Sequence, residues 1–543
     1  MKESAPRDAL YSPDQVRALL DGHFSTFRSL VEQARALFRE NKSNSAAAFA
    51  QIAADYAWKN PPGQLASPEL EQMLRDLGRK FLPARSTTSQ STSRSTPKRI
   101  LHVLTTAYPL GGHTRFVWRW IRQDSGRAHS IVLTGQRGAK VPTQLEQAVK
   151  TAGGGIHFLD ERFGRLFQRA EILRQLSRQS DLVILHVHPY DVLPILAFSE
   201  EHRVTPTVYV NHADHVFSIG VATSDIVANI RTSGYVTSFK RRGIQKDRGT
   251  VLPIPLGEIL RTQSRADAKR ILGVPESCVV LLSIASASKY RPISEISFCS
   301  AVLPVLERCE QACLMLVGPE CDDQWREAVA RFPDRIKIMG RQENTATFYE
   351  AADIYVDSFP FASLTSLLEA GSYGLPLVTF FPYSNSASVL GADDIALENC
   401  MVRATTLEEY RNKLCELVED PNRRMSLGER TQTYVTASHR GEGWMRHLEH
   451  LYNQALRTKP VSGCALDESL DAADELDEWL VRLHQNGGIS CSLQEIFKSH
   501  LGLLPLGMRL RKWVKLRSLN PKALAAALAP DWVYARVRRW VWS

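Results

Sequence analysis

The sequence lacks the long apolar runs from which a membrane-spanning segment is built. No stretch of its 543 residues approaches 18 consecutive apolar side chains, and the amino-terminal MKESAPRDALYSPD has no apolar core like that of a signal peptide. We therefore expect a cytosolic protein. With 44% apolar and 23% charged residues, the chain is too apolar to be disordered throughout, and its length predicts roughly two to four domains.

Cysteine is scarce and poorly spaced for cross-linking or metal binding. The nine cysteines all lie at or beyond Cys278, and no two form a CxxC pair. Disulfide frameworks and zinc sites need clustered spacings, so neither is expected. The dinucleotide-binding pattern GxGxxG is absent from the first glycine-containing loop, TTAYPLGGHTRF.

Excess positive charge is confined to the carboxyl-terminal tail. Of the net charge of +9, residues 508–543 carry +8, from nine Lys or Arg against Asp531, so the other residues together carry only +1. The same tail holds four of the ten tryptophans. We therefore predict that the body of the protein binds no nucleic acid and that the tail is a local electrostatic attachment.

Residues 1–82 are predicted to form a helical domain. Apolar side chains recur at intervals of three and four in residues 16–38 and 46–58, and Ser67-Pro68 is a typical helix start. Residues 83–98 are predicted to be a linker, because nine of the eleven residues 86–96 are Ser or Thr. Such a run buries too little apolar surface to offset the entropy lost on ordering.

From residue 99 onward the pattern changes to short apolar runs separated by helical stretches. The runs form two series, RILHVLTT, SIVLTG, DLVILHVH and TVYVNH, then VVLLSIAS, CLMLVG, IKIMG, DIYVDS and PLVTF. Apolar runs without polar alternation are typical of parallel strands covered on both faces. We predict an α/β protein with two doubly wound, Rossmann-like domains at 99–256 and 257–456, followed by a helical extension at 457–543.

Candidate site residues of the first domain lie in the loops after the strands, because open parallel sheets bind ligands at the carboxyl ends of their strands. They are Gly111, Gly112, His113, His188, His212 and Asp214. Glycines let backbone amides approach a ligand, and a His–Asp cluster suits acid–base chemistry or hydroxyl binding. Two plainer interpretations stay open: a tight turn at the glycines, and a helix cap with surface histidines at 211–215.

The second domain offers a phosphate-binding pattern. Lys289 and Arg291 follow a strand, and two cations there suit a diphosphate, although a solvated loop is the alternative. After DIYVDS, Thr365 and Ser366 stand at the start of a helix, whose amino-terminal end carries partial positive charge. Glu369 lies one turn further along that helix.

These segments resemble the GT-B glycosyltransferases, especially the broad family-4 type. EAGSYGLPLVT resembles the EAxAxGxPVV signature, and RIKIMGRQENTATFYEAADIYVDS resembles the stretch that precedes it. LVILHVH and VYVNHAD resemble strands of the acceptor domain, and GEGWMRHLEHLY resembles the helix that crosses back to that domain. The resemblance covers about residues 99–456 and is more specific in the donor-domain part.

The resemblance implies a role for each candidate residue in transfer of a sugar from a nucleotide-sugar donor. Lys289 and Arg291 would bind the diphosphate, Thr365 and Ser366 would cap it, Glu369 would accept ribose hydroxyls, and Gly340 and Arg341 would lie beside the base. Gly111, Gly112 and His113 would close over the sugar, while His188, His212 and Asp214 would face the acceptor, with His212 the first candidate for catalysis. No metal and no further cofactor are implied.

One position departs from the family pattern. Family-4 enzymes usually carry an acid eight residues before the residue that corresponds to Glu369, and this chain has Phe361 there. The segment FPFASLTSLLEAG is somewhat similar to loops of O-GlcNAc-transferase-like and protein-glycosylating GT-B enzymes, which favours an inverting transfer. A protein-glycosylating enzyme and a scaffold that binds sugar without turnover stay open as alternatives, whereas the basic tail disfavours an epimerase.

The tail itself suggests where the acceptor lies. MRLRKWVKLRSL (508–519) and WVYARVRRWVW (532–542) interleave cations with large apolar side chains. Tryptophan prefers the membrane interface, and each Lys or Arg gains about 1 kcal/mol near an anionic leaflet. We therefore expect a peripheral protein on the cytoplasmic membrane face with a lipid-linked or cell-envelope glycan as acceptor. The alternative is a basic helix packed on the acidic segment 466–478.

Overall fold

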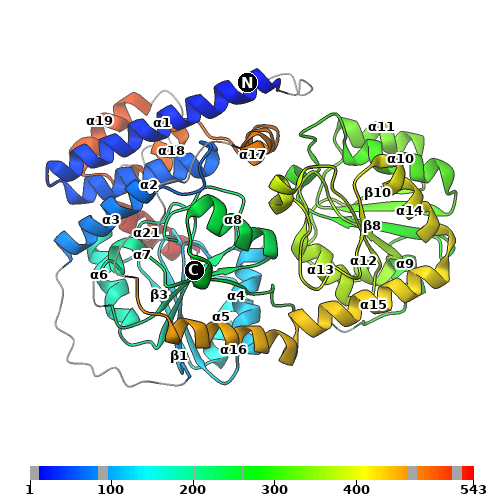
Figure 1. Ribbon diagram of the computed structural model, residues 1–543, viewed down its shortest axis with the longest axis horizontal. Helices are drawn as coiled ribbons and strands as arrows, with labels where there is room; N and C mark the ends of the chain where they lie inside the picture. Colours follow the sequence, from blue (N-terminus) through cyan, green and yellow to red (C-terminus); the bar gives the residue numbers. More distant parts are fainter. Residues whose placement is uncertain are drawn as a thin grey trace.

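Two sheets of parallel strands, one after the other along the chain, form the centre of the molecule (Figure 1). The computed structural model describes residues 11–82, 96–109, 111–200, 203–221, 223–259, 261–461, 474–516 and 529–542. Most of the predicted Ser/Thr linker, and most of the acidic segment 466–478, lie outside these ranges.

The first sheet has seven strands in the order β3-β2-β1-β4-β5-β6-β7. Its strands are β1 (Arg99–Leu104), β2 (Ala128–Leu133), β3 (Ile156–Phe158), β4 (Leu182–His186), β5 (Thr207–Asn211), β6 (Ile226–Asn229) and β7 (Gly249–Val251). The order reverses between β1 and β4, so a crevice opens beyond the carboxyl ends of these two strands. The helices of this domain are α4 (Gly112–Gln123), α5 (Thr143–Thr151), α6 (Leu166–Ser177), α7 (Leu193–Ala197) and α8 (Thr232–Arg242), with the short η1 (Lys246–Arg248).

The second sheet has six strands in the order β10-β9-β8-β11-β12-β13. They are β8 (Val279–Ile284), β9 (Ala312–Val317), β10 (Ile336–Ile338), β11 (Ile354–Val356), β12 (Leu377–Phe380) and β13 (Val402–Ala404). Its order reverses between β8 and β11. Around it lie α9 (Arg265–Ile271), α10 (Phe298–Arg308), α11 (Asp323–Arg331), α12 (Ala346–Ala351), α13 (Leu364–Ser372), α14 (Leu407–Glu419) and α15 (Pro421–His439), with η2 (Ala287–Tyr290) and η3 (Asn385–Leu390).

Every apolar run that predicts a strand forms one, and the predicted α/β fold with two Rossmann-like domains is confirmed. The sequence pattern misses β3, β6, β7 and β13. Each of these has only three or four residues. A run of that length gives only a weak apolar pattern, which the sequence shows in the equally short β10, β11 and β12 but not clearly in these four strands.

Helix α16 (Gly441–Arg457) crosses from the second domain back to the first, as Figure 1 shows. Its Trp444 is fully buried and donates from Nε1 to the Pro253 carbonyl oxygen at 2.7 Å. Five residues earlier in the chain, His439 lies between the Ile254 carbonyl oxygen (2.8 Å) and Asp394 (3.0 Å). The chain crosses between the domains twice, near Pro253 and near His439, and these hydrogen bonds join the two crossing segments to each other.

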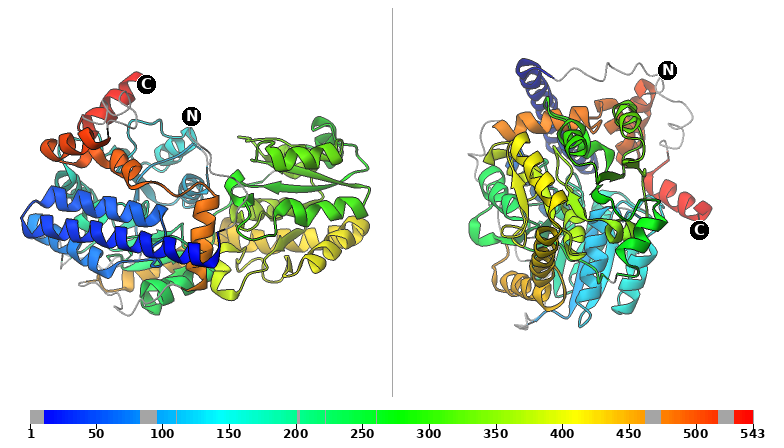
Figure 2. Two further views of the ribbon diagram at one scale, coloured as in Figure 1. Left: turned by 90° about the horizontal axis from the view of Figure 1, so that it is seen from above. Right: turned by 90° about the vertical axis from the view of Figure 1, so that its right-hand side faces the viewer.

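Most helices at the two ends of the chain pack on the first domain (Figure 2). They are α1 (Pro13–Arg39), α2 (Ser43–Lys59) and α3 (Pro68–Phe81), then α18 (Leu493–His500), η4 (Leu501–Leu503), α19 (Leu506–Leu516) and α21 (Asp531–Trp542). Helix α17 (Glu475–Asn486) packs instead on α1 and on η3 of the second domain. The described residues 11–82 have no core of their own, because Phe27 and Ile52 share one apolar cluster with Val103, Leu185 and Ile496. The alanine-rich α2 is buried on nearly all sides, which is typical of a core helix.

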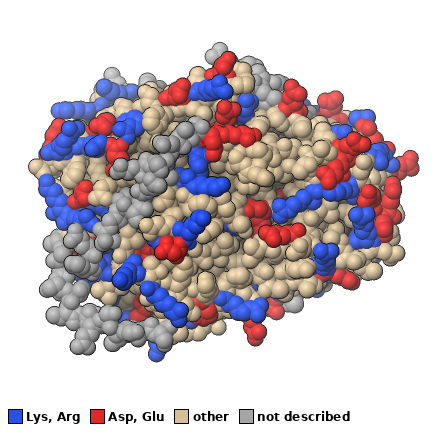
Figure 3. Space-filling model, in the orientation of Figure 1, with Lys and Arg blue, Asp and Glu red and all other residues tan. Residues whose placement is uncertain are grey.

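Acidic and basic side chains are interspersed over both domains on the face shown in Figure 3. Among the residues that the structure describes, no helix combines the length and the apolar character needed to cross a membrane.

Candidate active site

The predicted site residues of the two domains meet where the carboxyl ends of the two sheets approach each other. Gly111, with φ of 113°, adopts a backbone conformation that favours glycine, and Gly112 begins α4. A Cβ atom on Gly112 would lie 3.1 Å from Thr365 Oγ1, which stands at the start of α13 in the second domain. The glycine loop of the first domain and the helix start of the second domain are thus in close contact.

The amino-terminal end of α13 is arranged as an anion site. Its N-cap, Ser363, caps no backbone amide with its side chain, and instead its hydroxyl donates to Ser366 Oγ at 3.2 Å. The loop before it is fixed by Asp357, whose Oδ1 accepts from the backbone amides of Ser358 (2.9 Å) and Ser363 (3.0 Å). The first-turn amides, with Thr365 and Ser366 beside them, are therefore available to an anion.

Lys289 reaches this loop from the other side of the crevice between β8 and β11. Its Nζ donates to the Ala362 carbonyl oxygen at 2.6 Å and lies 4.6 Å from the centre of the Phe361 ring. Burial lowers the pKa of Lys289, and the nearby Asp357 carboxylate opposes this shift. The cation is therefore held at the α13 end of the crevice, where a phosphate of the donor would gain from it.

Arg291 does not lie beside Lys289 in this structure, and its part in binding the diphosphate stays a prediction. Its side chain is exposed and donates from Nη1 to the Asn486 carbonyl oxygen of α17, at 2.9 Å. This hydrogen bond to the carboxyl-terminal extension holds the Arg291 side chain outside the crevice. Gly340 and Arg341 follow β10 at the same edge of the sheet, and Gly340 accepts from the Gly318 amide at 2.7 Å; their role beside the base stays a prediction.

Glu369 is engaged by the first domain. Its Oε1 accepts from Arg119 Nη2 at 2.5 Å, Arg115 Nη1 lies 3.5 Å away, and Tyr349 donates to Oε2 at 3.3 Å. Both arginines belong to α4. The carboxylate predicted to accept ribose hydroxyls therefore also forms an ion pair that bridges the two domains.

His113, His188 and His212 lie together on the first-domain side. The His113 ring is 4.6 Å from the His212 ring and 6.1 Å from the His188 ring. His113 donates from Nε2 to the His186 carbonyl oxygen at 2.8 Å, since a carbonyl can only accept. Its Nδ1 is buried and has no partner among the described residues. His188 stacks on Tyr108 and meets Trp58 of α2.

A line of hydrogen-bonded imidazoles runs from His212 into the sheet. His212 Nε2 is 2.9 Å from His186 Nδ1, His186 Nε2 is 3.0 Å from His102 Nδ1, and His102 Nε2 is 3.0 Å from His129 Nδ1. His129 Nε2 ends the line 3.1 Å from the Asp124 carbonyl oxygen and 3.3 Å from its carboxylate. We call these four residues and Asp124 the histidine chain.

The strand register places the histidine chain on one face of the sheet. Residues 100, 102 and 104 of β1 point to the same side. His129 of β2 lies opposite Ile100, and His186 of β4 lies opposite Leu104. The three rings therefore form a diagonal across three strands towards the carboxyl edge. Trp120 of α4 covers them, with its ring 5.4 Å from His102.

The end at Asp124 determines the tautomer of every ring. The carbonyl and carboxylate of Asp124 accept, so His129 carries its proton on Nε2 and presents the lone pair of Nδ1 to His102. By the same rule, each ring in turn donates from Nε2 when all are neutral. The chain leaves His212 with a bare Nδ1, and within the described part of the protein this atom makes no hydrogen bond.

Burial favours the neutral form of the rings at the crevice end. It lowers the pKa of His212 well below 6.5, and the neighbouring His113 and His188 lower it further. The same cause lowers the pKa of His113 to about 4 and of His188 to about 3. At neutral pH, His113 and His212, whose rings are 4.6 Å apart, thus each keep an Nδ1 lone pair without a partner among the described residues, and such a lone pair suits a hydroxyl donor.

Asp214 is buried and paired with Arg231, and its predicted role towards an acceptor stays a prediction. It is 1% exposed, and its two oxygens accept from Arg231 at 2.7 and 2.8 Å. Arg231 also donates to the Gly391 carbonyl oxygen of the second domain at 2.7 Å. Burial alone would raise the pKa of Asp214, but the Arg231 charge outweighs it and holds the pKa far below its usual range. This pair fastens the domains together.

Sequence reasoning missed Arg115, Arg119 and Arg231, and it did not identify the histidine chain as a unit. A signal for the histidines was present, because RILHVL, AHSIVL and LVILH each place one imidazole within an otherwise apolar run. A buried polar side chain in such a run needs a partner. The arginines left no signal, since their partners lie 17 to 254 residues away in the chain.

Comparison with known proteins agrees with this architecture. Residues 282–420, within the second domain, match the family model described as glycosyl transferases group 1. The match includes the segment EAGSYGLPLVT and so confirms the resemblance that this segment carries. No curated protein matches the chain.

Two solved structures are similar in fold. A glycosyltransferase from Rickettsia africae ESF-5 has a TM-score of 0.53 and 12% identity, over 67% of this chain and 100% of that chain. HepE of Anabaena, solved in complex with UDP, has a TM-score of 0.51 and 14% identity, over 65% of this chain and 98% of that chain. The chain therefore has the two-domain GT-B fold.

The tautomers of the histidine chain are testable by NMR of protein carrying ¹⁵N-labelled histidine. We expect Nε2–H signals for His102, His129, His186 and His212 at neutral pH, because the acceptors of Asp124 orient the line. His212 should stay neutral well below pH 6.5. His129→Gln preserves one donor and one acceptor and should keep the His212 signal, whereas His129→Leu should give mixed tautomers. A wild-type Nδ1–H signal at His212, or an unchanged His212 signal in His129→Leu, would contradict the assignment.

Proposed function

We propose that the protein is a glycosyltransferase that moves a sugar from a nucleotide-sugar donor to a glycan. One observation carries the proposal. Lys289 and the amino-terminal end of α13 lie on one side of the domain boundary, and Gly112, His113 and His212 lie on the other side. A cation and a helix end suit a diphosphate, and neutral imidazoles suit an attacking hydroxyl. The family match of residues 282–420 supports the same function.

On the donor side, the nucleoside diphosphate lies between Lys289 and the start of α13. The first-turn amides, Thr365 and Ser366 donate to its phosphate oxygens, and Lys289 offsets their charge. As the bond from the anomeric carbon to the phosphate oxygen breaks, negative charge accumulates on the diphosphate. These fixed donors therefore stabilise the leaving group more than the bound donor, which is what speeds the reaction.

On the acceptor side, His212 is the general base in this proposal. A hydroxyl of the acceptor donates to His212 Nδ1, its oxygen attacks the anomeric carbon, and its proton passes to Nδ1 as the nucleoside diphosphate departs. The imidazolium that forms is stabilised along the histidine chain, which ends at Asp124. A single displacement of this kind inverts the anomeric centre. Phe361, in the position where family-4 enzymes usually have an acid, favours it over a retaining route.

A scaffold that binds nucleotide sugars without turnover is the second candidate. Phe361 favours it, because its ring lies between Lys289 Nζ (4.6 Å) and the His215 ring (4.7 Å) and puts no acid in the crevice. The two bare imidazole lone pairs favour the enzyme. Turnover separates the two.

Lys289→Ala should weaken binding of the nucleoside diphosphate by roughly 10- to 150-fold, because one charge-assisted contact is lost. Arg291→Ala removes the same charge from the same loop and should leave the affinity nearly unchanged, because Arg291 contacts α17. The measurement is calorimetric titration with UDP, GDP and ADP. Equal losses in the two variants, or none in Lys289→Ala, would remove the phosphate assignment.

His212→Ala should lower turnover by about 10²- to 10⁴-fold and keep the affinity for the donor, because it removes the base but no phosphate contact. Turnover is followed by mass spectrometry after incubation with common nucleotide sugars, with and without a membrane extract. His450→Ala, on the exposed face of α16, is the control. If His212→Ala loses donor affinity and turnover in proportion, His212 binds the donor and is not the base.

We further propose that the carboxyl-terminal helices hold the protein at an anionic membrane surface, where a lipid-linked or cell-envelope glycan is the acceptor. On α21, Val537, Trp540 and Val541 are 55%, 81% and 64% exposed, beside Arg536 and Arg538. On α19, Leu510 and Val514 are also exposed. Trp513 of α19 packs against the core instead. Exposed apolar side chains flanked by cations suit a membrane interface.

Trp540→Ser with Val541→Ser should weaken co-sedimentation with phosphatidylglycerol-containing vesicles by about 10- to 100-fold, because two interfacial apolar contacts are lost. Met425→Ser with Tyr434→Ser on α15 removes a comparable exposed apolar area from the second domain and should have no effect. Added salt should weaken wild-type binding. If the wild type does not pellet at low salt, or both double variants pellet equally, the tail does not attach the protein.

A further inference from the structure

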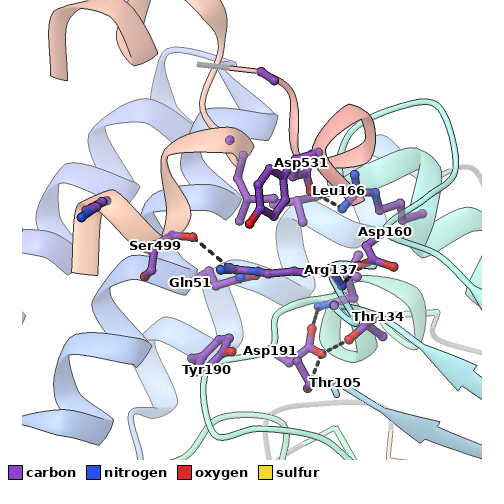
Figure 4. Close-up of a pocket in the computed structure, with 18 of the residues that line it drawn as sticks. Gln51, Thr105, Thr134, Arg137, Asp160, Leu166, Tyr190, Asp191, Ser499 and Asp531 are labelled. Carbon is purple, nitrogen blue, oxygen red and sulfur yellow. Dashed lines mark hydrogen bonds and ion pairs between the residues drawn. The ribbon is translucent and has the colours of Figure 1, made fainter. Parts of the chain in front are cut away.

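A cavity of about 500 Å³ lies in the first domain beside the candidate active site (Figure 4). It falls within the usual size range of sites for small organic ligands, which is roughly 300–1,000 Å³. Its walls come from the first sheet and from the helices at both ends of the chain, and no residue of the second domain lines it. The nucleotide donor, which the second domain binds, is therefore not its occupant.

The floor of the cavity is the carboxyl edge of the first sheet. Thr105, Thr134, Asp160 and Asp191 line it, and each follows a strand, from β1 to β4. The crevice between β1 and β4, where the strand order reverses, is the expected ligand position in an open parallel sheet. Asp191 fixes this floor, because its Oδ2 accepts from Thr105 (2.8 Å) and Thr134 (2.5 Å).

The roof is built by segments outside the two sheet domains. Gln51 of α2, Ser499 of α18 and Tyr534 of α21 line the cavity from above. Arg137 reaches across and donates from Nη2 to the Ser499 carbonyl oxygen at 2.8 Å, as Figure 4 shows. Its φ of 52° is unusual for a long side chain and is typical of residues held for function.

Two buried charged side chains that line this cavity have polar atoms without partners among the described residues. Asp160 is 3% exposed and Arg169 is 2% exposed, and both line the cavity. Within the described ranges, Asp160 Oδ1 and the Nε and Nη2 of Arg169 have no hydrogen-bond partner, although Arg169 Nη1 pairs with Asp531 at 2.5 Å. Buried polar atoms are costly when unpaired, so an acceptor and two donors here indicate a polar ligand.

The charges of the lining balance. Arg137, Arg169, Lys498 and Arg538 face Asp160, Asp191, Glu495 and Asp531. A balanced lining gives no net attraction to a phosphate or to a cation. Hydroxyl groups, which both donate and accept, satisfy such a mixed set, and the tyrosine rings of Tyr190 and Tyr534 offer flat surfaces to the C–H faces of a sugar ring. We propose that this cavity binds a neutral saccharide.

The cavity adjoins the candidate active site. His188 donates from its backbone amide to Thr105 Oγ1 at 2.8 Å, and its Nδ1 lies 3.1 Å from the Tyr190 hydroxyl. Thr105 and Tyr190 line the cavity, while His188 lies beside His113. Resting on the proposed function, the saccharide is the part of the acceptor glycan that lies beyond the hydroxyl to be glycosylated.

The test is direct binding to the full chain without donor. Maltose, cellobiose, lactose and N,N′-diacetylchitobiose are titrated singly and followed by saturation-transfer NMR, with inorganic phosphate as the anionic probe. At least one disaccharide should bind the wild type. Arg137→Ala should weaken it by about 10-fold or more, because a hydrogen bond from a charged group is lost. Arg162→Ala removes an exposed charge from a nearby loop and should leave binding unchanged. A second variant, Tyr534→Ala, removes the part of the cavity wall that α21 supplies and should also weaken disaccharide binding.

The outcomes separate this inference from the proposed function. Disaccharide binding that depends on Arg137 and Tyr534, with UDP affinity unchanged in both variants, supports the saccharide site even if no nucleotide sugar is turned over. The site is overturned if no disaccharide binds the wild type at millimolar concentration, if Arg162→Ala has the same effect as Arg137→Ala, or if phosphate binds in an Arg137-dependent manner and the sugars do not.

Discussion

A single buried carboxylate, Asp124, connects the sheet, the crossing helix and the candidate base. Its Oδ1 accepts from Arg127 (2.6 Å) and its Oδ2 from Tyr452 of α16 (2.7 Å), while His129 lies against both its carbonyl and its carboxylate. Burial alone would raise its pKa, but these hydrogen bonds, led by that of His129, outweigh burial and lower it. A charge in the interior is tolerable only with such a full set of partners. Because the same carboxylate receives Tyr452 and orients His129, the packing of α16 and the tautomer of His212 depend on one group. A change at Asp124 would therefore reach the crevice through the four rings, by altering the tautomer of His212.

Charged side chains join the two domains, and one of them, Glu369, is also the carboxylate proposed to bind the donor. Arg119 and Arg115 of α4 occupy Glu369, and Arg231 joins Asp214 to the loop at Gly391. A ribose hydroxyl is a weaker partner for a carboxylate than a guanidinium is. If Glu369 binds the ribose, it does so by exchanging one arginine contact, or by accepting the hydroxyl on Oε2 beside Tyr349. In that case the ion pair would oppose donor binding, and the contacts proposed for the donor at Lys289 and the α13 end would have to offset its loss.

The sequence allowed the fold and the start of helix α13 to be predicted, because these depend on local pattern. The unbroken apolar runs identified every long strand, and the helix start at Thr365 and Ser366 could be recognised from its order along the chain. Contacts across strands and domains could not be recognised in this way. His102, His129 and His186 align only because their strands pair in one register, and periodicity along a strand does not reveal register. Asp214 was predicted as a site residue because it follows a strand beside histidines, and its pairing with the buried Arg231 left no local signal. The contact of Arg291 with α17 could not be predicted either, because no pattern linked the carboxyl-terminal extension to the second domain.

That extension decides how freely the domains can separate. Leu476, Leu480 and Leu483 of α17 form an apolar cluster with Ala387, Val389 and Leu390 of the second domain, and Arg291 donates to the end of the same helix. The other face of α17 packs on α1, and Arg241 of α8 pairs with its Asp477. Helix α17 is therefore a strap from the first domain to the second, on the opposite end of the crevice from α16. Burial of a leucine contributes roughly 1.5–3 kcal/mol, so opening the domains by a hinge at α16 has to expose several kcal/mol of apolar surface at α17. The roof of the cavity belongs to the same extension. His500 at the end of α18 pairs with Asp55 of α2 (2.7 Å), and Asp531 of α21 pairs with Arg169 of α6 (2.5 Å). These two contacts lie outside the second domain, so a separation of the domains would have to break the apolar contacts of α17 but not these pairs.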